Sequence, residues 1–334
     1  MEEITEAGTI DDLVADADAA PFDCKATPRL IRDWSQLGLL DYPQRRPAGK
    51  GHGSAPALYP ASQRNLLLTL LRHRPTNGIR SLARIPVGIW LYWGDTYVSL
   101  SQARRSLMTW LGDPRASKRE ARESAQAILG LVDSPVATAR ARRELLAELT
   151  YAAWTGQPDF QRIEQAVRAV FEPSASTIIR AVGHPAAPIM TDSMMAVMKA
   201  RFKAVSALLD GDVTDAMLEQ ARDAHRFAYA EYATRQPFLA AKAPSLYEPI
   251  TAEETLNRCC GHLLSTLGME ILHPDAATRL QRERAFRRPP GLAAFGLTMR
   301  PEAGASAAAN SSSQATSDPR RSRPQASPSQ RDSS

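Results

Sequence analysis

Apolar residues recur at helical spacing along most of the chain, so the pattern predicts a mostly α-helical protein. From residue 116 to 273, every segment with a clear period is helical. Breaks that contain proline, glycine or aspartate separate these segments, and no heptad pattern is long enough to predict a dimerisation coiled coil. The expected helices of this region cover residues 117–132, 137–154, 159–171, 192–209, 214–234 and 252–271.

Two helix starts are expected near the N-terminus. Thr9 can cap a helix whose first turn carries two aspartates, where the helix dipole favours negative charge. Thr27 and Pro28 open a second helix, because threonine is a good N-cap and proline suits the first helical position. This helix is expected to run to about Gln36 and to end at Gly38. Its buried stripe is predicted to consist of Leu30, Ile31, Trp34 and Leu37.

The segments that follow are less regular. Residues 44–56 are basic, rich in glycine and without a period. They fit a flexible linker, and they also fit the tip of a two-stranded wing whose return strand is 57–59. A helix is expected over 62–73, and apolar connecting helices over 79–115. Residues 301–334 contain no Leu, Ile, Val, Phe, Trp or Tyr, which predicts a disordered tail from about residue 289.

Charge is distributed unevenly along the chain. Residues 1–24 carry eight acidic and no basic side chains, whereas residues 27–85 carry ten basic and two acidic ones. A basic block of this size fits a polyanion such as DNA or RNA, or else a solvated surface. The chain shows no apolar leader and no apolar run of about 20 residues. We therefore expect a soluble cytoplasmic protein, associated with the nucleoid and not with a membrane.

Catalytic motifs are missing from the sequence. There is no GxxxxGK[ST] loop, HExxH, GxSxG or paired CxxC motif, so we expect neither an enzyme nor a cofactor or metal. The three cysteines, Cys24, Cys259 and Cys260, do not make a disulfide framework. Cys259 and Cys260, with His262, form the one thiol–imidazole cluster. Neighbouring residues of a helix point about 100° apart, which favours a buried structural role for the cysteines over a metal or redox sensor.

The helix that begins at Thr27-Pro28 continues through Ile31-Arg32 and Trp34, is followed by Gly38-Leu39-Leu40, and leads into a basic segment that closes on Leu58-Tyr59. This order of signals over residues 8–75 resembles the winged helix-turn-helix of the MerR family. The resemblance covers about a fifth of the chain. Asp33 stands where that family usually has the first tyrosine of a pair, and Trp34 replaces the second aromatic residue. Trp34 is expected in the core, with a contact to the DNA backbone as the alternative.

The resemblance implies a DNA-binding site on the second helix, the wing and the helix after it. A helix fits the major groove, and residues near its N-terminus meet base edges. Arg29 is expected to bind guanine and Arg32 a phosphate, while the wing residues follow the backbone or enter the minor groove. The nine expected DNA-binding residues are Thr27, Arg29, Arg32, Arg45, Arg46, Lys50, His52, Tyr59 and Arg64.

These inferences give a domain plan. It consists of a disordered acidic N-terminus (1–8), a MerR-like winged helix (9–78), apolar connecting helices (79–115), a helical effector or oligomerisation domain (116–288) and a disordered tail (289–334).

Three functions fit this plan. The first is a transcription regulator that binds double-stranded DNA as a homodimer, with a small-molecule effector or a protein partner for the helical domain. The second is an excisionase-like or replication-type DNA-architecture protein of a phage, plasmid or integrative element. The third is a helical scaffold. The many alanines and arginines are typical of a high-GC bacterium or its mobile elements.

Overall fold

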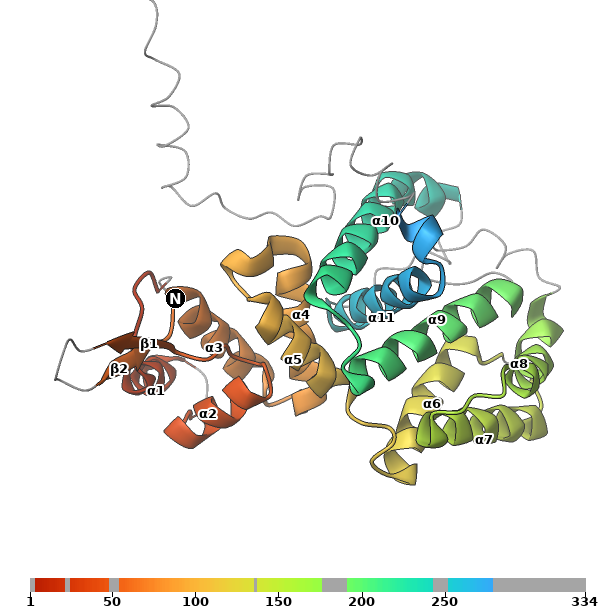
Figure 1. Cartoon of the computed structure of the whole chain (residues 1–334), viewed down its shortest axis with the longest axis horizontal. Coiled ribbons are helices and arrows are strands. Elements are labelled where there is room, and N and C mark those ends of the chain that lie inside the picture. The colour runs from red at the N-terminus through yellow and green to blue at the C-terminus, as the bar shows by residue number, and fades with distance from the viewer. Residues whose placement is uncertain are drawn as a thin grey trace, which may run out of the picture.

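The computed structural model describes residues 4–21, 25–47, 54–134, 137–175, 191–242 and 252–278 of the 334-residue chain. The described part is mostly helical and contains one two-stranded antiparallel sheet (Figure 1). Each of the six helices expected after residue 116 is present. The expected tail over 289–334 lies outside the described residues. The elements are α1 (Ile10–Ala19), α2 (Pro28–Gln36), β1 (Gln44–Pro47), β2 (Ser54–Leu58), α3 (Ala61–His73), α4 (Ile79–Trp93), the 3-10 helix η1 (Gly94–Thr96), α5 (Leu100–Leu111), α6 (Lys118–Val132), α7 (Ala139–Thr155), α8 (Phe160–Ala175), α9 (Thr191–Asp210), α10 (Asp215–Lys242) and α11 (Ala252–Leu272).

The first helix begins at the expected cap. The Thr9 N–H donates to the Asp12 carboxylate at 2.7 Å, and the Asp12 N–H donates back to the Thr9 hydroxyl at 3.3 Å. This reciprocal pair is a capping box, which satisfies amides that the first helical turn leaves without partners.

The N-terminal segment is more ordered than expected. Gly8 and Tyr59 form an antiparallel bridge, with N–H to carbonyl distances of 3.0 and 2.7 Å. The Asn65 side chain bonds both the N–H and the carbonyl of Ile4, at 3.2 and 2.7 Å. The expectation of a disordered segment is therefore wrong for residues 4–8, because two distant segments satisfy its backbone. Residues 1–3 lie outside the described residues.

Strands β1 and β2 form an antiparallel hairpin over the segment that fitted either a linker or a wing. Gln44 pairs with Leu58 and Arg46 with Ala55, and a register irregularity lies between the first pair and the second. The residues at the tip, 48–53, lie outside the described residues.

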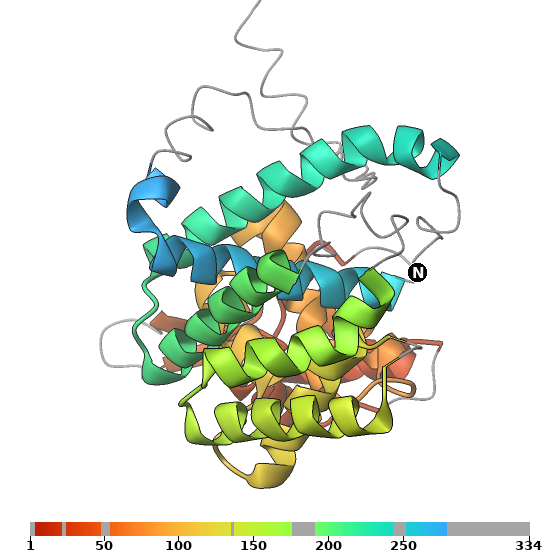
Figure 2. The same cartoon turned by 90° about the vertical axis from the view of Figure 1, so that its right-hand side faces the viewer.

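The buried core divides at a different place from the expected domain boundary. One apolar cluster includes side chains from α1 to α5 and continues into α9, α10 and α11. A second cluster joins α6, α7 and α8 to the first part of α9, at Met194 and Met195. Figure 1 shows α4 and α5 between the N-terminal elements and α6–α8, and in Figure 2, which looks at the right-hand side of that view, α7 and α8 lie in front of the N-terminal elements. Residue 116 therefore does not separate two cores.

Helix α9 can serve both cores because of its length. Its 20 residues span about 30 Å at 1.5 Å per residue. Met194 lies in the second cluster, whereas Ala204 and Leu208 lie in the first. A Cβ added to Gly268 of α11 would lie 1.7 Å from the Ala200 carbonyl oxygen, so glycine permits the close approach of α9 and α11.

None of the helices among the described residues combines the length and the apolar character that a membrane crossing requires.

Candidate nucleic-acid interface

Helix α2 has one buried and one exposed face. Its N-cap is Thr27, whose hydroxyl accepts the Leu30 N–H at 3.2 Å, and Pro28 follows at the first helical position. The buried face includes Ile31 and Trp34, and both side chains have no exposed surface. This burial confirms Trp34 as a core residue and excludes it as a contact to the DNA backbone. The exposed face consists of Arg29, Arg32, Asp33 and Gln36.

Three carbonyl groups after α2 are held by side chains of α5. The Thr109 hydroxyl donates to the Leu37 carbonyl at 2.7 Å, and the Ser106 hydroxyl donates to the Gly38 carbonyl at 2.6 Å. The Gln102 amide donates to the Leu39 carbonyl at 3.1 Å.

The three donors lie on one face of α5 because their spacings of four and three residues match the helical period. These bonds satisfy three successive backbone carbonyls of the turn that follows α2, and they fix the end of α2 in place. Helix α5 lies in the segment expected to hold only connecting helices, and it holds the end of α2 in place.

The chain between α2 and β1 is fixed to the same helix. The Arg105 guanidinium donates to the Asp41 carboxylate at 2.9 Å, and the Ser99 hydroxyl donates to it at 2.6 Å. The guanidinium also lies 4.4 Å from the ring centre of Tyr42, a side chain that is 52% exposed. These contacts set the direction in which the chain enters the hairpin.

Two of the expected wing residues are exposed on β1. Arg45 and Arg46 both face solvent, and the Arg46 guanidinium donates to the Pro56 carbonyl of β2 at 3.1 and 3.2 Å. The expected contacts at Lys50 and His52 lie outside the described residues.

The structure corrects two of the nine expected DNA-binding residues. The Tyr59 side chain is only 2% exposed and packs in the core, so it does not face a ligand. The Arg64 guanidinium donates to both oxygens of Asp16 on α1, each at 2.8 Å, and also to the Glu6 carbonyl at 3.0 Å. The bonds to Asp16 raise the pKa of the Arg64 guanidinium above its ordinary value. Arg64 therefore joins α3 to α1 and is not available for a phosphate.

The sequence pattern did not single out two further side chains near α2. Gln36 completes the exposed face of the helix, and its spacing of four residues from Arg32 could have identified it. The Arg74 guanidinium, from the end of α3, lies 5.9 Å from the ring centre of Trp34. No local pattern links Arg74 to α2, because the two segments meet only in the folded chain.

A buried polar cluster joins α4, α10 and α11. The Tyr92 hydroxyl lies 3.1 Å from Nε2 of His225 and 3.2 Å from Sγ of Cys259. Nδ1 of His225 lies 3.0 Å from Nδ1 of His262, and its ring lies 4.8 Å from that of Tyr229. The sequence grouped Cys259 and Cys260 with His262, whereas Tyr92 and His225 join them only in the folded chain.

Burial controls the ionisation of this cluster. It lowers the pKa of His225 well below its ordinary value, and the nearby His262 and Arg226 lower it further. Burial also raises the pKa of the Cys259 and Cys260 thiols, which are 1% and 0% exposed. A buried neutral thiol is inert. The expectation that both cysteines are buried is confirmed, and the described residues contain no group of three side chains suited to a metal ion.

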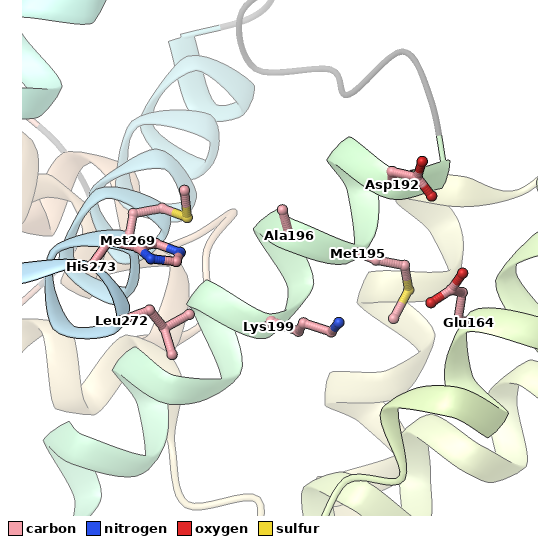
Figure 3. Close-up of a pocket in the computed structure, with 8 residues that line it drawn as sticks. All are labelled: Glu164, Asp192, Met195, Ala196, Lys199, Met269, Leu272 and His273. Carbon is pink, nitrogen blue, oxygen red and sulfur yellow. The ribbon is translucent and has the colours of Figure 1, made fainter. Parts of the chain in front are cut away.

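A shallow depression lies between α8, α9 and the end of α11 (Figure 3). Its volume is about 340 Å³, at the lower end of the range for small-molecule sites. Two of its carboxylates, Glu164 and Asp192, already pair with Arg168 at 2.8 Å each. Its remaining charged lining includes Lys199, which extends from α9 toward Glu164 in Figure 3. The expected effector of the helical domain stays a prediction, and this depression is where we would first test it.

Comparisons with known proteins supply no relative for this chain. No family model matches the sequence, and searches of curated proteins and of solved structures give no significant match.

Proposed function

We propose that this protein binds double-stranded DNA through α2 and the β1–β2 hairpin and regulates transcription at the bound site. In this proposal α2 is the recognition helix and the hairpin is the wing of a MerR-like domain. The observation that carries the proposal is the exposed face of α2, on which Arg29, Arg32 and Gln36 project from a helix whose other face is buried.

The dimensions of α2 suit the major groove. An α-helix with its side chains is about 10 to 12 Å across, and the major groove is about 12 Å wide and admits one. The nine residues of α2 span about 13 Å along the helix axis. The Arg29 side chain is 91% exposed one residue after Pro28, at the end of the helix that enters the groove first. Arginine binds guanine through two hydrogen bonds, so Arg29 would read a base and Arg32 would contact a phosphate.

The hairpin and the support of α2 favour the same assignment. Arg45 and Arg46 add two exposed cations on β1, the next element of the chain after α2, where they would follow the DNA backbone. The three hydrogen bonds from α5 keep α2 in one orientation. Base recognition requires such a rigid support, because a side chain misplaced by about 1 Å loses its contacts.

The remaining helices would bring two such units together. A regulator usually binds a near-palindromic site as a dimer, since two half-sites require two recognition helices. In this proposal α6–α11 supply the contacts between subunits and bind an effector or a protein partner.

The decisive test is DNA selection by the full-length protein. Bound duplexes are selected from a random library, and affinity for the selected site is then measured at 50 and 200 mM salt. The Arg29→Ala/Arg32→Ala variant is compared with a control that removes two exposed arginines from α6 and α7, Arg119→Ala/Arg140→Ala (80% and 84% exposed).

We expect selective binding that weakens with salt and is lost in the α2 variant. In this proposal Arg32 makes the one phosphate contact of the two residues, so its loss would lower the salt slope by about one. The control should bind like the wild type, and circular dichroism should show both variants folded. Equal, weak and unselective binding by all three proteins would refute the proposal. A single palindromic footprint would support a regulator, whereas cooperative tandem footprints would favour the DNA-architecture protein.

A further inference from the structure

The exposed face of α2 carries an acidic side chain that stability does not explain. Asp33 is 54% exposed, and its carboxylate lies 3.9 Å from the Arg29 guanidinium, four residues earlier. An exposed pair of this kind stabilises a helix very little, and the order of base before acid is the less favourable one. Asp33 also lies in the second half of α2, where the helix dipole disfavours a negative charge.

An acid at this position also weakens general attraction to DNA. Two exposed cations, Arg29 and Arg32, lie on the exposed face of α2 with Asp33, and the hairpin of the proposed site adds Arg45 and Arg46, which are exposed on β1. A carboxylate that faces a phosphate is repelled, so Asp33 would be unfavourable on a surface that contacts only the DNA backbone. A contact to a base edge removes this conflict.

Cytosine is the base edge that suits a carboxylate. In the major groove, guanine presents two acceptors, adenine an acceptor beside its donor, and thymine an acceptor and a methyl group. Cytosine presents its N4 amino donor and no acceptor. An acceptor on guanine, adenine and thymine therefore repels a carboxylate. The cytosine edge has only a donor, from which a carboxylate accepts a hydrogen bond.

We propose that Arg29 and Asp33 together read a guanine and a cytosine that lie one or two base pairs apart in the major groove. This inference rests on the proposed function and names its target class, a half-site with two G·C pairs. The spacing fits: four helical residues rise about 6 Å, and successive base pairs are about 3.4 Å apart. Without DNA, the carboxylate stays beside the Arg29 guanidinium.

The test compares Asp33→Asn with the wild type in the same full-length selection. The matched control is Glu144→Gln on α7, because Arg140 and Glu144 form the same exposed pair at the same spacing, 84% and 52% exposed. Affinities are then measured for the selected site, for sites with single C·G→T·A changes and for a random duplex.

We expect the wild type and Glu144→Gln to prefer cytosine at one position by about tenfold or more. Asp33→Asn should lose that preference, keep the preference for guanine and bind the random duplex more tightly. If Asp33→Asn binds all duplexes more tightly with its cytosine preference intact, Asp33 only repels phosphates and the inference is overturned. If the wild type selects no site, the proposed function and this inference both fail.

Discussion

Replacing Gly38 with alanine should uncouple α2 from its support. Gly38 has a φ of +75°, which costs an alanine about 1 kcal/mol. The added Cβ would lie 2.4 Å from the backbone nitrogen of Ser106, and neither backbone can yield without separating α2 from α5.

That separation breaks the three hydrogen bonds that Gln102, Ser106 and Thr109 make to this turn, each worth about 1 kcal/mol. Together with the cost of the positive φ, we therefore expect Gly38→Ala to lower the free energy of unfolding by about 4 kcal/mol.

The control for this prediction is Gly211→Ala. Gly211 has nearly the same φ, +79°, but an added Cβ would meet no atom within 4 Å. Gly211→Ala should therefore lower the free energy of unfolding by only about 1 kcal/mol, which is the cost of a positive φ for alanine. Stability is measured by urea denaturation, and hydrogen exchange reports on the amides of α2. Equal losses in the two variants, with α2 still protected in Gly38→Ala, would refute the view that α5 supports α2.

Three further changes test other parts of the structure. Arg64→Ala should destabilise the fold by about 1 to 2 kcal/mol, because it leaves Asp16 unpaired at 16% side-chain exposure; a loss in urea no greater than that of the exposed Arg140→Ala would contradict this. Trp34→Ala should cost about 3 to 5 kcal/mol in the same assay, because it empties a fully buried site; a loss below 1 kcal/mol would place Trp34 outside the core. His225 stays neutral when folded, because burial lowers its pKa, but takes up a proton near pH 6.5 when unfolded. The contribution of His225 to the free energy of unfolding is therefore complete above pH 6.5. As the pH decreases below 6.5, this contribution decreases by at most about 1.4 kcal/mol per pH unit. Between pH 7.5 and 5.5, His225→Phe should lose less stability than the wild type or the exposed His73→Phe variant; parallel losses would exclude His225 as the source.

Local chemistry was sufficient to predict most of the helices of this protein. Thr9 and Thr27 cap the helices that begin after them, α2 ends before Gly38 as expected, and the helices beyond residue 116 lie where the apolar period placed them. Each signal depends on residues within one or two turns of one another, so the sequence contains it in full. The exposed face of α2 follows from the same period, and with it Arg29 and Arg32.

The tertiary structure alone decided which side chains are free and how the cores divide. Arg64 meets Asp16 across 48 residues, and Gln102 reaches the Leu39 carbonyl across 63. No helical or strand period extends over such separations. A basic residue in a basic segment therefore has the same local pattern whether it faces solvent or an internal carboxylate. The common core of α1–α5 with α9–α11 has the same origin, because an apolar stripe indicates that a face is buried but does not name the helix that covers it.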